Sequence, residues 1–249
     1  MSQVFSDNIL YYSPGSVFSN IAILLLCEKG IQDQFEFRPL QMRVDNIAPW
    51  YIQMNPKGQV PTLVHAGKAI PDSLNIARHI DECFGLSPVL STRDANVLSI
   101  VEKWRQVRVL SLVAGKKTET QDVDALKGTL QESRQSVIRN IEEHPELEEQ
   151  YKIRLSIHDD RTKILIDHDT YLLHKASLAS LFDELEINLQ ENNGHLLPNK
   201  IRSVADIYVT GILYWLISKL DKDILKYRPI IQSYYLKQSS RPSFIRAFV

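Results

Sequence analysis

A proline interrupts a stretch of sequence that otherwise looks like a β-strand. Residues 54–63 read MNPKGQVPTL, and the residues after Pro61 have a strand-like composition. Proline cannot donate to a strand ladder, so it is confined to edges, first positions and bulges. The Pro-x-Gly turn just before it favours a bend. The pattern predicts a strand that begins at a bend, and the role of that bend in the fold must be explained.

The global composition narrows the classes of protein. The chain has 249 residues, 44% of them hydrophobic, which is enough for one large or two small domains. With 29 basic and 30 acidic residues its formal charge is −1, so we expect no nucleic-acid partner. Cys27 and Cys83 form no CxxC motif, which favours a reducing compartment and a cytoplasmic location. The apolar run 21–27 is too short to cross a bilayer, so we expect no membrane anchor.

Strand-like and helical segments alternate in the first third of the chain. The expected order is β-α-β-α-β-β-α, with strands at 9–12, 35–38, 62–65 and 68–70 and helices at 17–29, 48–54 and 74–84. Gly30 ends the first helix as glycines commonly do, and Asp72 with Ser73 caps the third. The pattern predicts a small α/β domain over residues 1–86.

Strand signals almost vanish after residue 93, and apolar residues then recur at helical spacing. We therefore expect an all-helical domain over residues 93–249. Its helices include 171–192, capped by Asp169, and 207–220, which follows the capping box Ser203-Val204-Ala205-Asp206. Residues 116–165 are highly charged and predict an exposed helical excursion interrupted at His144-Pro145.

The element order of the first domain is that of the thioredoxin fold, which places a cis-proline at the start of its third strand. A cis bond before Pro61 would leave the backbone of Val60 free to pair with an extended peptide. The chain resembles the glutathione transferase superfamily in five motifs: YSPGSVFSNIAILLLCEKG (12–30), NPKGQVPTL (55–63), IPDS (70–73), SVADI (203–207) and RPSF (241–244). Within it, residues 144–147, 166–169 and 183–186 are similar to the ganglioside-induced differentiation-associated proteins and the tetrachlorohydroquinone dehalogenases.

The resemblance implies a glutathione site. It makes Val60 the backbone partner of the cysteinyl unit, gives Asp72 and Ser73 the γ-glutamyl group, and places Gln59 where a side chain reaches the glycyl carboxylate. The residue types suit these roles, since the first turn of a helix favours a carboxylate and Asp72 can hold an ammonium group. No residue of the excursion is expected to contact glutathione.

Ser16 matches the position of the catalytic serine or cysteine after the first strand. Its hydroxyl would donate to the glutathione sulfur and stabilise the thiolate. Ser13 and Ser19 are rivals, and Ser16 could instead be only an N-cap. The dehalogenase pattern has a nucleophilic cysteine two positions later, where this chain has Phe18. Dehalogenation through an enzyme cysteine is therefore disfavoured.

Other residues have weaker assignments. Trp104, Arg105 and Arg108 fall at the spacing of one helix face beside the first domain and are candidates for the acceptor pocket, although core packing explains Trp104 equally well. Neither 158–160 nor 167–169 offers metal ligands at i and i+4, so we expect no metal. Cys27 and Cys83 are expected to be small core residues.

The leading interpretation is a glutathione transferase that joins the glutathione thiolate to a hydrophobic electrophile. The first alternative is a glutathione- or hydrophobic-ligand-binding adaptor with little turnover. A weaker alternative is glutathione-dependent reduction or ether cleavage. The resemblance also allows a homodimer, whose usual interface the excursion could obstruct.

Overall fold

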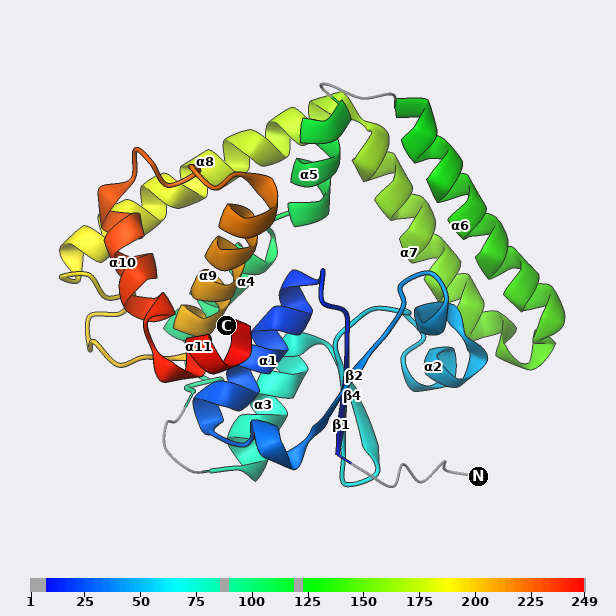
Figure 1. Cartoon of the computed structure of the whole chain (residues 1–249), viewed down its shortest axis with the longest axis horizontal. Coiled ribbons are helices and arrows are strands. Elements are labelled where there is room, and N and C mark those ends of the chain that lie inside the picture. Colours follow the sequence, from blue (N-terminus) through cyan, green and yellow to red (C-terminus); the bar gives the residue numbers. More distant parts are fainter. Residues whose placement is uncertain (1–7, 86–89, 119–122, 249) are drawn as a thin grey trace.

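The computed structural model describes residues 8–85, 90–118 and 123–248. Its N-terminal part contains a four-stranded sheet in the order β2-β1-β3-β4 (Figure 1). The strands are β1 (Ile9–Tyr12), β2 (Glu36–Pro39), β3 (Thr62–His65) and β4 (Lys68–Pro71). β1 runs parallel to β2 and antiparallel to β3, which is antiparallel to β4. The hairpin between β3 and β4 turns at Ala66-Gly67, as predicted, and both residues have positive φ.

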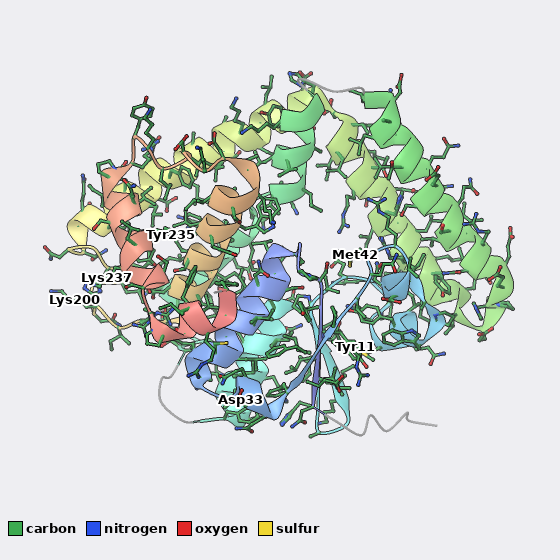
Figure 2. The ribbon with its side chains drawn as sticks, in the orientation of Figure 1. Tyr11, Asp33, Met42, Lys200, Tyr235 and Lys237 are labelled. Atoms are coloured by element: carbon green, nitrogen blue, oxygen red, sulfur yellow. The ribbon has the colours of Figure 1, made fainter. Side chains whose placement is uncertain are left out.

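Helices cover both faces of the sheet. α1 (Val17–Lys29) and α3 (Ser73–Cys83) lie on one face, and α2 (Pro49–Met54) lies on the other (Figure 1). Side chains alternate along β1, so Leu10 packs toward α1 while Tyr11 faces α2. Figure 2 shows Tyr11 on the α2 side, where its ring lies 5.4 Å from that of Trp50. This is the predicted thioredoxin-like arrangement.

The remainder of the described chain is helical. Its α-helices are α4 (Ala95–Arg105), α5 (Val109–Thr118), α6 (Val123–Glu143), α7 (Glu148–Ile166), α8 (His168–Glu191), α9 (Val204–Trp215), α10 (Pro229–Ser239) and α11 (Pro242–Phe248). The predicted capping box is present at the start of α9: Asp206 Oδ2 accepts from the Ser203 N–H at 2.9 Å, and Ser203 Oγ accepts from the Ala205 N–H at 3.3 Å. α9 is buried almost throughout and packs against α1, which joins the two domains. Asp167, not Asp169, caps α8.

The charged excursion is an antiparallel pair, α6 and α7, joined by the 3-10 turn η3 (Pro145–Leu147). The two ends of the excursion lie close together, because Gly115 of α5, just before it, packs directly on the ring of Tyr171 in α8, just after it. The pair extends from there to the N-terminal domain, which its tip meets at α2 (Figure 1).

The expectation of a mostly exposed excursion is wrong at this tip. Val137, Leu147 and Tyr151 form a buried cluster with Ile47 and Ile52 of the N-terminal domain. Apolar residues are sparse in the excursion, but they concentrate at its tip and so bury a local face.

Among the helices that the structure describes, none combines the length and the apolar character that a bilayer span requires.

The α1–α9 interface depends on a residue without a side chain. A Cβ at Gly211 would lie 2.7 Å from Cγ1 of Ile21. We expect Gly211→Val to lower the free energy of unfolding by about 1–3 kcal/mol in urea denaturation, because the core is overpacked. Gly128→Val on α6 is the control, since a Cβ there meets nothing within 4 Å. It should change stability by less than about 0.5 kcal/mol, and equal losses would contradict the packing argument.

Candidate functional site

Three segments that are distant in sequence meet at one end of the sheet. Tyr11 pairs with Thr62, and Thr62 pairs with Pro71 on the next strand. Neighbouring strands lie about 4.8 Å apart. The segments beyond these residues, 12–16, 59–61 and 71–73, are therefore brought together. We call this end of the sheet the converging end.

Buried polar side chains hold the loop that leads into β3. Tyr51 donates from its hydroxyl to the carbonyl of Gln59 (2.6 Å), and Asn55 Nδ2 donates to the same carbonyl (2.8 Å). Asn55 Nδ2 also donates to Thr62 Oγ1 at 3.0 Å, and Tyr51 Oη lies 2.9 Å from that oxygen. Burial raises the pKa of Tyr51 to about 12, so its hydroxyl stays protonated. The loop geometry is fixed on both sides of Val60.

Val60 itself presents an unpaired backbone. The bond between Val60 and Pro61 is cis, the geometry that the sequence predicted. The Gln59 carbonyl is paired as above, and the Pro61 carbonyl accepts from the Asp72 N–H at 3.3 Å. Among the described residues, neither the N–H nor the C=O of Val60 has a partner. The half-buried Val60 therefore offers one donor and one acceptor to an extended ligand.

A negative and a positive group, the two charges needed to bind an amino acid, meet at the start of α3. Asp72 has φ of 78°, and its Oδ1 caps the helix by accepting from the Leu74 N–H at 2.8 Å. Its Oδ2 accepts from Nη2 of Arg105, a residue of α4, at 2.6 Å. The N–H of Ser73, in the first turn, has no partner among the described residues. A carboxylate, a guanidinium and a free N–H thus lie side by side.

The Ser73 side chain points away from solvent. Its Oγ lies 2.7 Å from the hydroxyl of Tyr208 on α9, and both residues are at least 98% buried. Burial raises the pKa of the Tyr208 phenol. Ser73 therefore offers its backbone N–H to a ligand, while its hydroxyl ties the helix start to the second domain.

The turn after β1 contains the three candidate serines. Ser19 is fully buried and its hydroxyl accepts from the Ser13 N–H at 3.1 Å, while Ser13 is 9% exposed. Ser16 is half-buried and caps α1 by accepting from the Ser19 N–H at 3.3 Å. Trp215 of α9 donates to the Gly15 carbonyl at 3.1 Å, which fixes the turn. A serine hydroxyl keeps its own proton while it accepts, so capping leaves Ser16 able to donate.

The α7 helix places an unpaired guanidinium against this loop, which sequence reasoning missed. Gly58 has φ of 55°, and a Cβ there would lie 2.6 Å from Cδ of Arg154. Arg154 is 5% exposed, and its Nε and Nη1 are enclosed with no hydrogen-bond partner among the described residues. Burial, and then the nearby Arg161, lowers the pKa of Arg154 to about 10, so it remains cationic at neutral pH. A buried charge without a counter-charge is strongly unfavourable, so this position suits an anion.

The three acceptor-pocket candidates do not share one helix face, because α4 ends at Arg105 and Arg108 lies in the link to α5. Trp104 is 2% exposed and packs on Phe182 with ring centroids 6.4 Å apart, which is core packing. Arg108 is exposed and donates to Gln106 Oε1 at 3.3 Å. Arg105, on the same helix as Trp104, is the residue that reaches the converging end.

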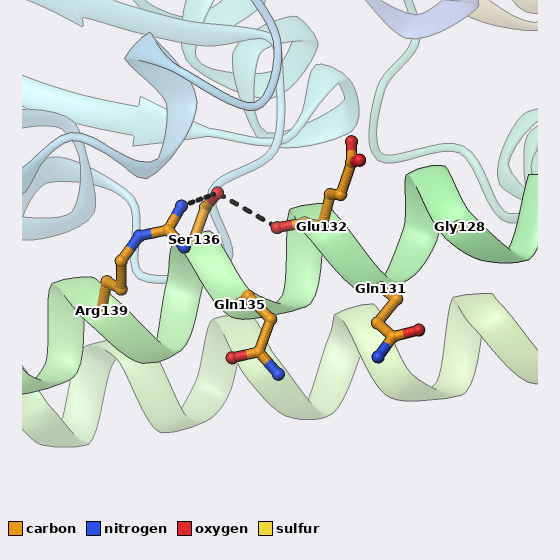
Figure 3. A pocket seen from close by; sticks show the side chains of 6 residues that line it. All are labelled: Gly128, Gln131, Glu132, Gln135, Ser136 and Arg139. Carbon is orange, nitrogen blue, oxygen red and sulfur yellow. Dashed lines mark hydrogen bonds between the residues drawn. The ribbon is translucent and has the colours of Figure 1, made fainter.

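A groove of about 620 Å³ runs along α6. It is lined by Gly128, Gln131, Glu132, Gln135, Ser136 and Arg139. Figure 3 shows Arg139 donating to Ser136 Oγ, which in turn donates to the Glu132 carbonyl. Of the described side chains that line the groove, none is aromatic or branched aliphatic, so they are not the residue types that usually line a pocket for a hydrophobic acceptor.

Comparison with known families supports the resemblance seen in the sequence. Residues 10–88 match the family model described as "Glutathione S-transferase, N-terminal domain". The tetrachloro-p-hydroquinone reductive dehalogenase of Sphingobium chlorophenolicum is 24% identical over 244 residues, covering 96% of this chain and 95% of that protein. Glutathione S-transferase U22 of Arabidopsis thaliana is 38% identical over 80 residues, which are 31% of this chain and 34% of that protein.

Solved structures show the same fold. The β-etherase LigF from Sphingobium sp. strain SYK-6 superposes with a TM-score of 0.70 at 21% identity, covering 98% of this chain and 99% of that one. Gtt2 from Saccharomyces cerevisiae gives a TM-score of 0.67 at 15% identity, with coverage of 96% and 100%. Together with the family-model match these findings bear out the predicted resemblance to the superfamily, and they confirm the predicted fold, a thioredoxin-like domain followed by an all-helical one.

The buried pair of Ser73 and Tyr208 predicts a measurable coupling. Tyr208→Phe should lower the free energy of unfolding by about 1–3 kcal/mol, because it leaves the Ser73 hydroxyl buried and unpaired. Ser73→Ala should do the same to Tyr208. The double variant should lose less than the sum of the two, as a double-mutant cycle by urea unfolding would reveal. Strict additivity would show that the two hydroxyls do not interact.

Proposed function

We propose that this chain, whose N-terminal domain and fold are those of the glutathione transferase superfamily, binds glutathione at the converging end and activates its thiol. The unpaired backbone of Val60 carries the proposal. One donor and one acceptor on a single residue match the cysteinyl unit of an extended tripeptide. Residues that can bind the two ends of glutathione and its thiol lie around Val60.

The γ-glutamyl end of glutathione is a zwitterion with an ammonium and a carboxylate on one carbon. In the proposed complex Asp72 holds the ammonium, while the Ser73 N–H and the helix dipole hold the carboxylate. Arg105, paired with Asp72 at 2.6 Å, supplies a second positive group beside that carboxylate. The ammonium and the carboxylate of the γ-glutamyl end would therefore each face groups of opposite charge.

The glycyl end then extends away from Asp72, across Val60 toward Gly58 and Gln59. Arg154 lies against Gly58 with two enclosed and unpaired nitrogens. We assign the glycyl carboxylate to Arg154, with Gln59 beside it. The ligand would provide the anion that a buried guanidinium requires.

The thiol lies near the turn after β1, where Ser16 is the most accessible of the three serines. Its hydroxyl donates to the sulfur and stabilises the thiolate, helped by the N-terminus of α1. The thiolate attacks a hydrophobic electrophile, forming a carbon–sulfur bond as the leaving group departs with its electron pair. Reductive dehalogenation through an enzyme cysteine is disfavoured, because Phe18 stands where that cysteine would be needed.

A glutathione-binding adaptor is the second candidate, favoured by one observation. Ser16 already serves as the N-cap of α1, and this role needs no ligand. The two candidates differ in turnover. Retention on immobilised glutathione, together with conjugation of a general aryl halide, supports the transferase. Retention without conjugation supports the adaptor, and absence of retention contradicts both.

Ser16→Ala should lower turnover about 10- to 100-fold, since one charge-assisted hydrogen bond to the sulfur is lost. Glutathione affinity should change little, because the tripeptide is held at its ends and at Val60. Steady-state kinetics and calorimetric titration measure the two effects separately. Ser13→Ala is the matched control and should keep near-normal turnover. Full activity in Ser16→Ala would transfer the role to another hydroxyl.

Arg154→Gln should weaken glutathione binding about 10- to 100-fold, because a charge-assisted hydrogen bond to the glycyl carboxylate is lost. Arg139→Gln, which removes an exposed arginine of the excursion, is the matched control and should bind normally.

A second ligand separates this role from a loss of folding. Glutathione esterified on its glycyl carboxylate should bind wild type and Arg154→Gln with similar affinity, because the group that Arg154 contacts is neutral. Calorimetry with both ligands gives the comparison. If the variant loses equal affinity for the ester, Arg154 supports the loop and does not bind the carboxylate.

A further inference from the structure

A second cluster of reactive side chains lies at the other end of β3. His65 is the last residue of β3, whereas Val60 and Pro61 precede its first residue. His79 and Cys83 lie in the second half of α3, four residues apart and so on one face of the helix. The cluster is therefore separate from the converging end, although the same strand and helix reach both.

The three side chains converge closely. His65 Nδ1 lies 2.8 Å from His79 Nε2, and Cys83 Sγ lies 3.7 Å from His79. One donor atom from each residue can be chosen so that all three lie within 4.8 Å of one another. Two aromatic rings, Phe35 at 5.8 Å and Phe84 at 5.2 Å, pack on the His65 imidazole and fix its orientation.

This spacing fits shared coordination of a metal ion. Zinc binds histidine nitrogen at about 2.0–2.1 Å and cysteine sulfur at about 2.3 Å, in tetrahedral geometry. Donor atoms around one such ion are therefore roughly 3.3–3.8 Å apart. The two imidazole nitrogens, 2.8 Å apart, need to separate by about half an ångström, and the widest donor pair, within 4.8 Å, needs to close by up to about 1 Å. A hydrogen bond between the imidazoles involves only two of the three groups, and the helix spacing adds the Cys83 thiol as a third donor beside them.

We propose that His65, His79 and Cys83 form a site for a borderline-soft divalent ion of the Zn²⁺ class. Two imidazoles and one thiolate are ligands that such ions prefer over Mg²⁺ or Ca²⁺. Three protein ligands leave a fourth position for water. Cys83 is exposed and the imidazoles are half-buried, so that position faces solvent.

The structure corrects one expectation about these residues. Cys83 is not a core residue, whereas Cys27 is buried as expected. The proposal also replaces the expectation of no metal. The i and i+4 spacing that residues 158–160 and 167–169 lack is present in His79 and Cys83, and His65 is added only by the fold.

Cobalt titration of the full-length protein tests the site. The protein is first freed of metal with a chelator, and no glutathione is present, because glutathione itself binds metals. We expect Co²⁺ to bind saturably, one ion per chain, with the near-ultraviolet absorption of a thiolate–cobalt bond. Zn²⁺ should abolish this absorption by displacement, and it should raise the melting temperature.

Substitutions identify the ligands. Cys83→Ser should remove the thiolate band, and His79→Gln should weaken Zn²⁺ binding about 10-fold or more. Cys27→Ser, which changes the buried cysteine, should keep both the band and the affinity. Retention on immobilised glutathione should be unchanged in Cys83→Ser, which also shows that the variant is folded. Absence of saturable binding, or a band that survives Cys83→Ser, would overturn the proposal.

Discussion

The candidate site depends on the hydrogen bonds that hold the loop before β3. Tyr51 and Asn55 both donate to the Gln59 carbonyl, and both contact Thr62 Oγ1. These groups are buried, so an unmade bond would be costly, and the loop has little freedom to rearrange. The network satisfies the residues on either side of Val60 but not Val60 itself. The bend at Pro61 thus leaves the Val60 backbone, just before the strand, available to pair with an extended peptide.

Gly58 belongs both to this loop and to the contact with the excursion. A glycine is required there, because φ is 55° and a Cβ would lie within 3 Å of Arg154 and of the Asn46 carbonyl. Asn46 Nδ2 donates to the Gly58 carbonyl at 2.7 Å, and the Ile47 carbonyl accepts from Tyr151 at 2.9 Å. The tip of the α6–α7 pair is therefore hydrogen-bonded to Ile47, and the neighbouring Asn46 holds Gly58 in the loop before β3. The excursion belongs structurally to the site region.

Much of the fold was predictable because its signals are local. Turn glycines, caps and strand alternation predicted the bounds of the strands and of α1 to α3 to within one or two residues. The motif around Pro61 predicted the location of the converging end. Arg154 and Tyr208 were not predictable as site residues, and Arg105 was a candidate for the acceptor pocket, not for the pair with Asp72. Helical spacing tells which residues share a face, but the partner of that face depends on packing over more than 30 residues of sequence. For the same reason the sparse apolar residues predicted a mostly exposed excursion, although several of them gather and are buried at its tip.

The charges around the converging end constrain the ligand more tightly than the fold does. A thioredoxin-like domain with a free backbone at Val60 suits many extended peptides, and fold alone does not select among them. Asp72 beside Arg105 favours an amino-acid zwitterion at one end, while a buried Arg154 favours a carboxylate at the other. Glutathione has both groups, separated by one cysteinyl unit. In the proposed complex the common fold positions the thiol, and the α6–α7 pair makes binding depend on the glycyl carboxylate, since an uncompensated guanidinium disfavours any ligand that lacks it.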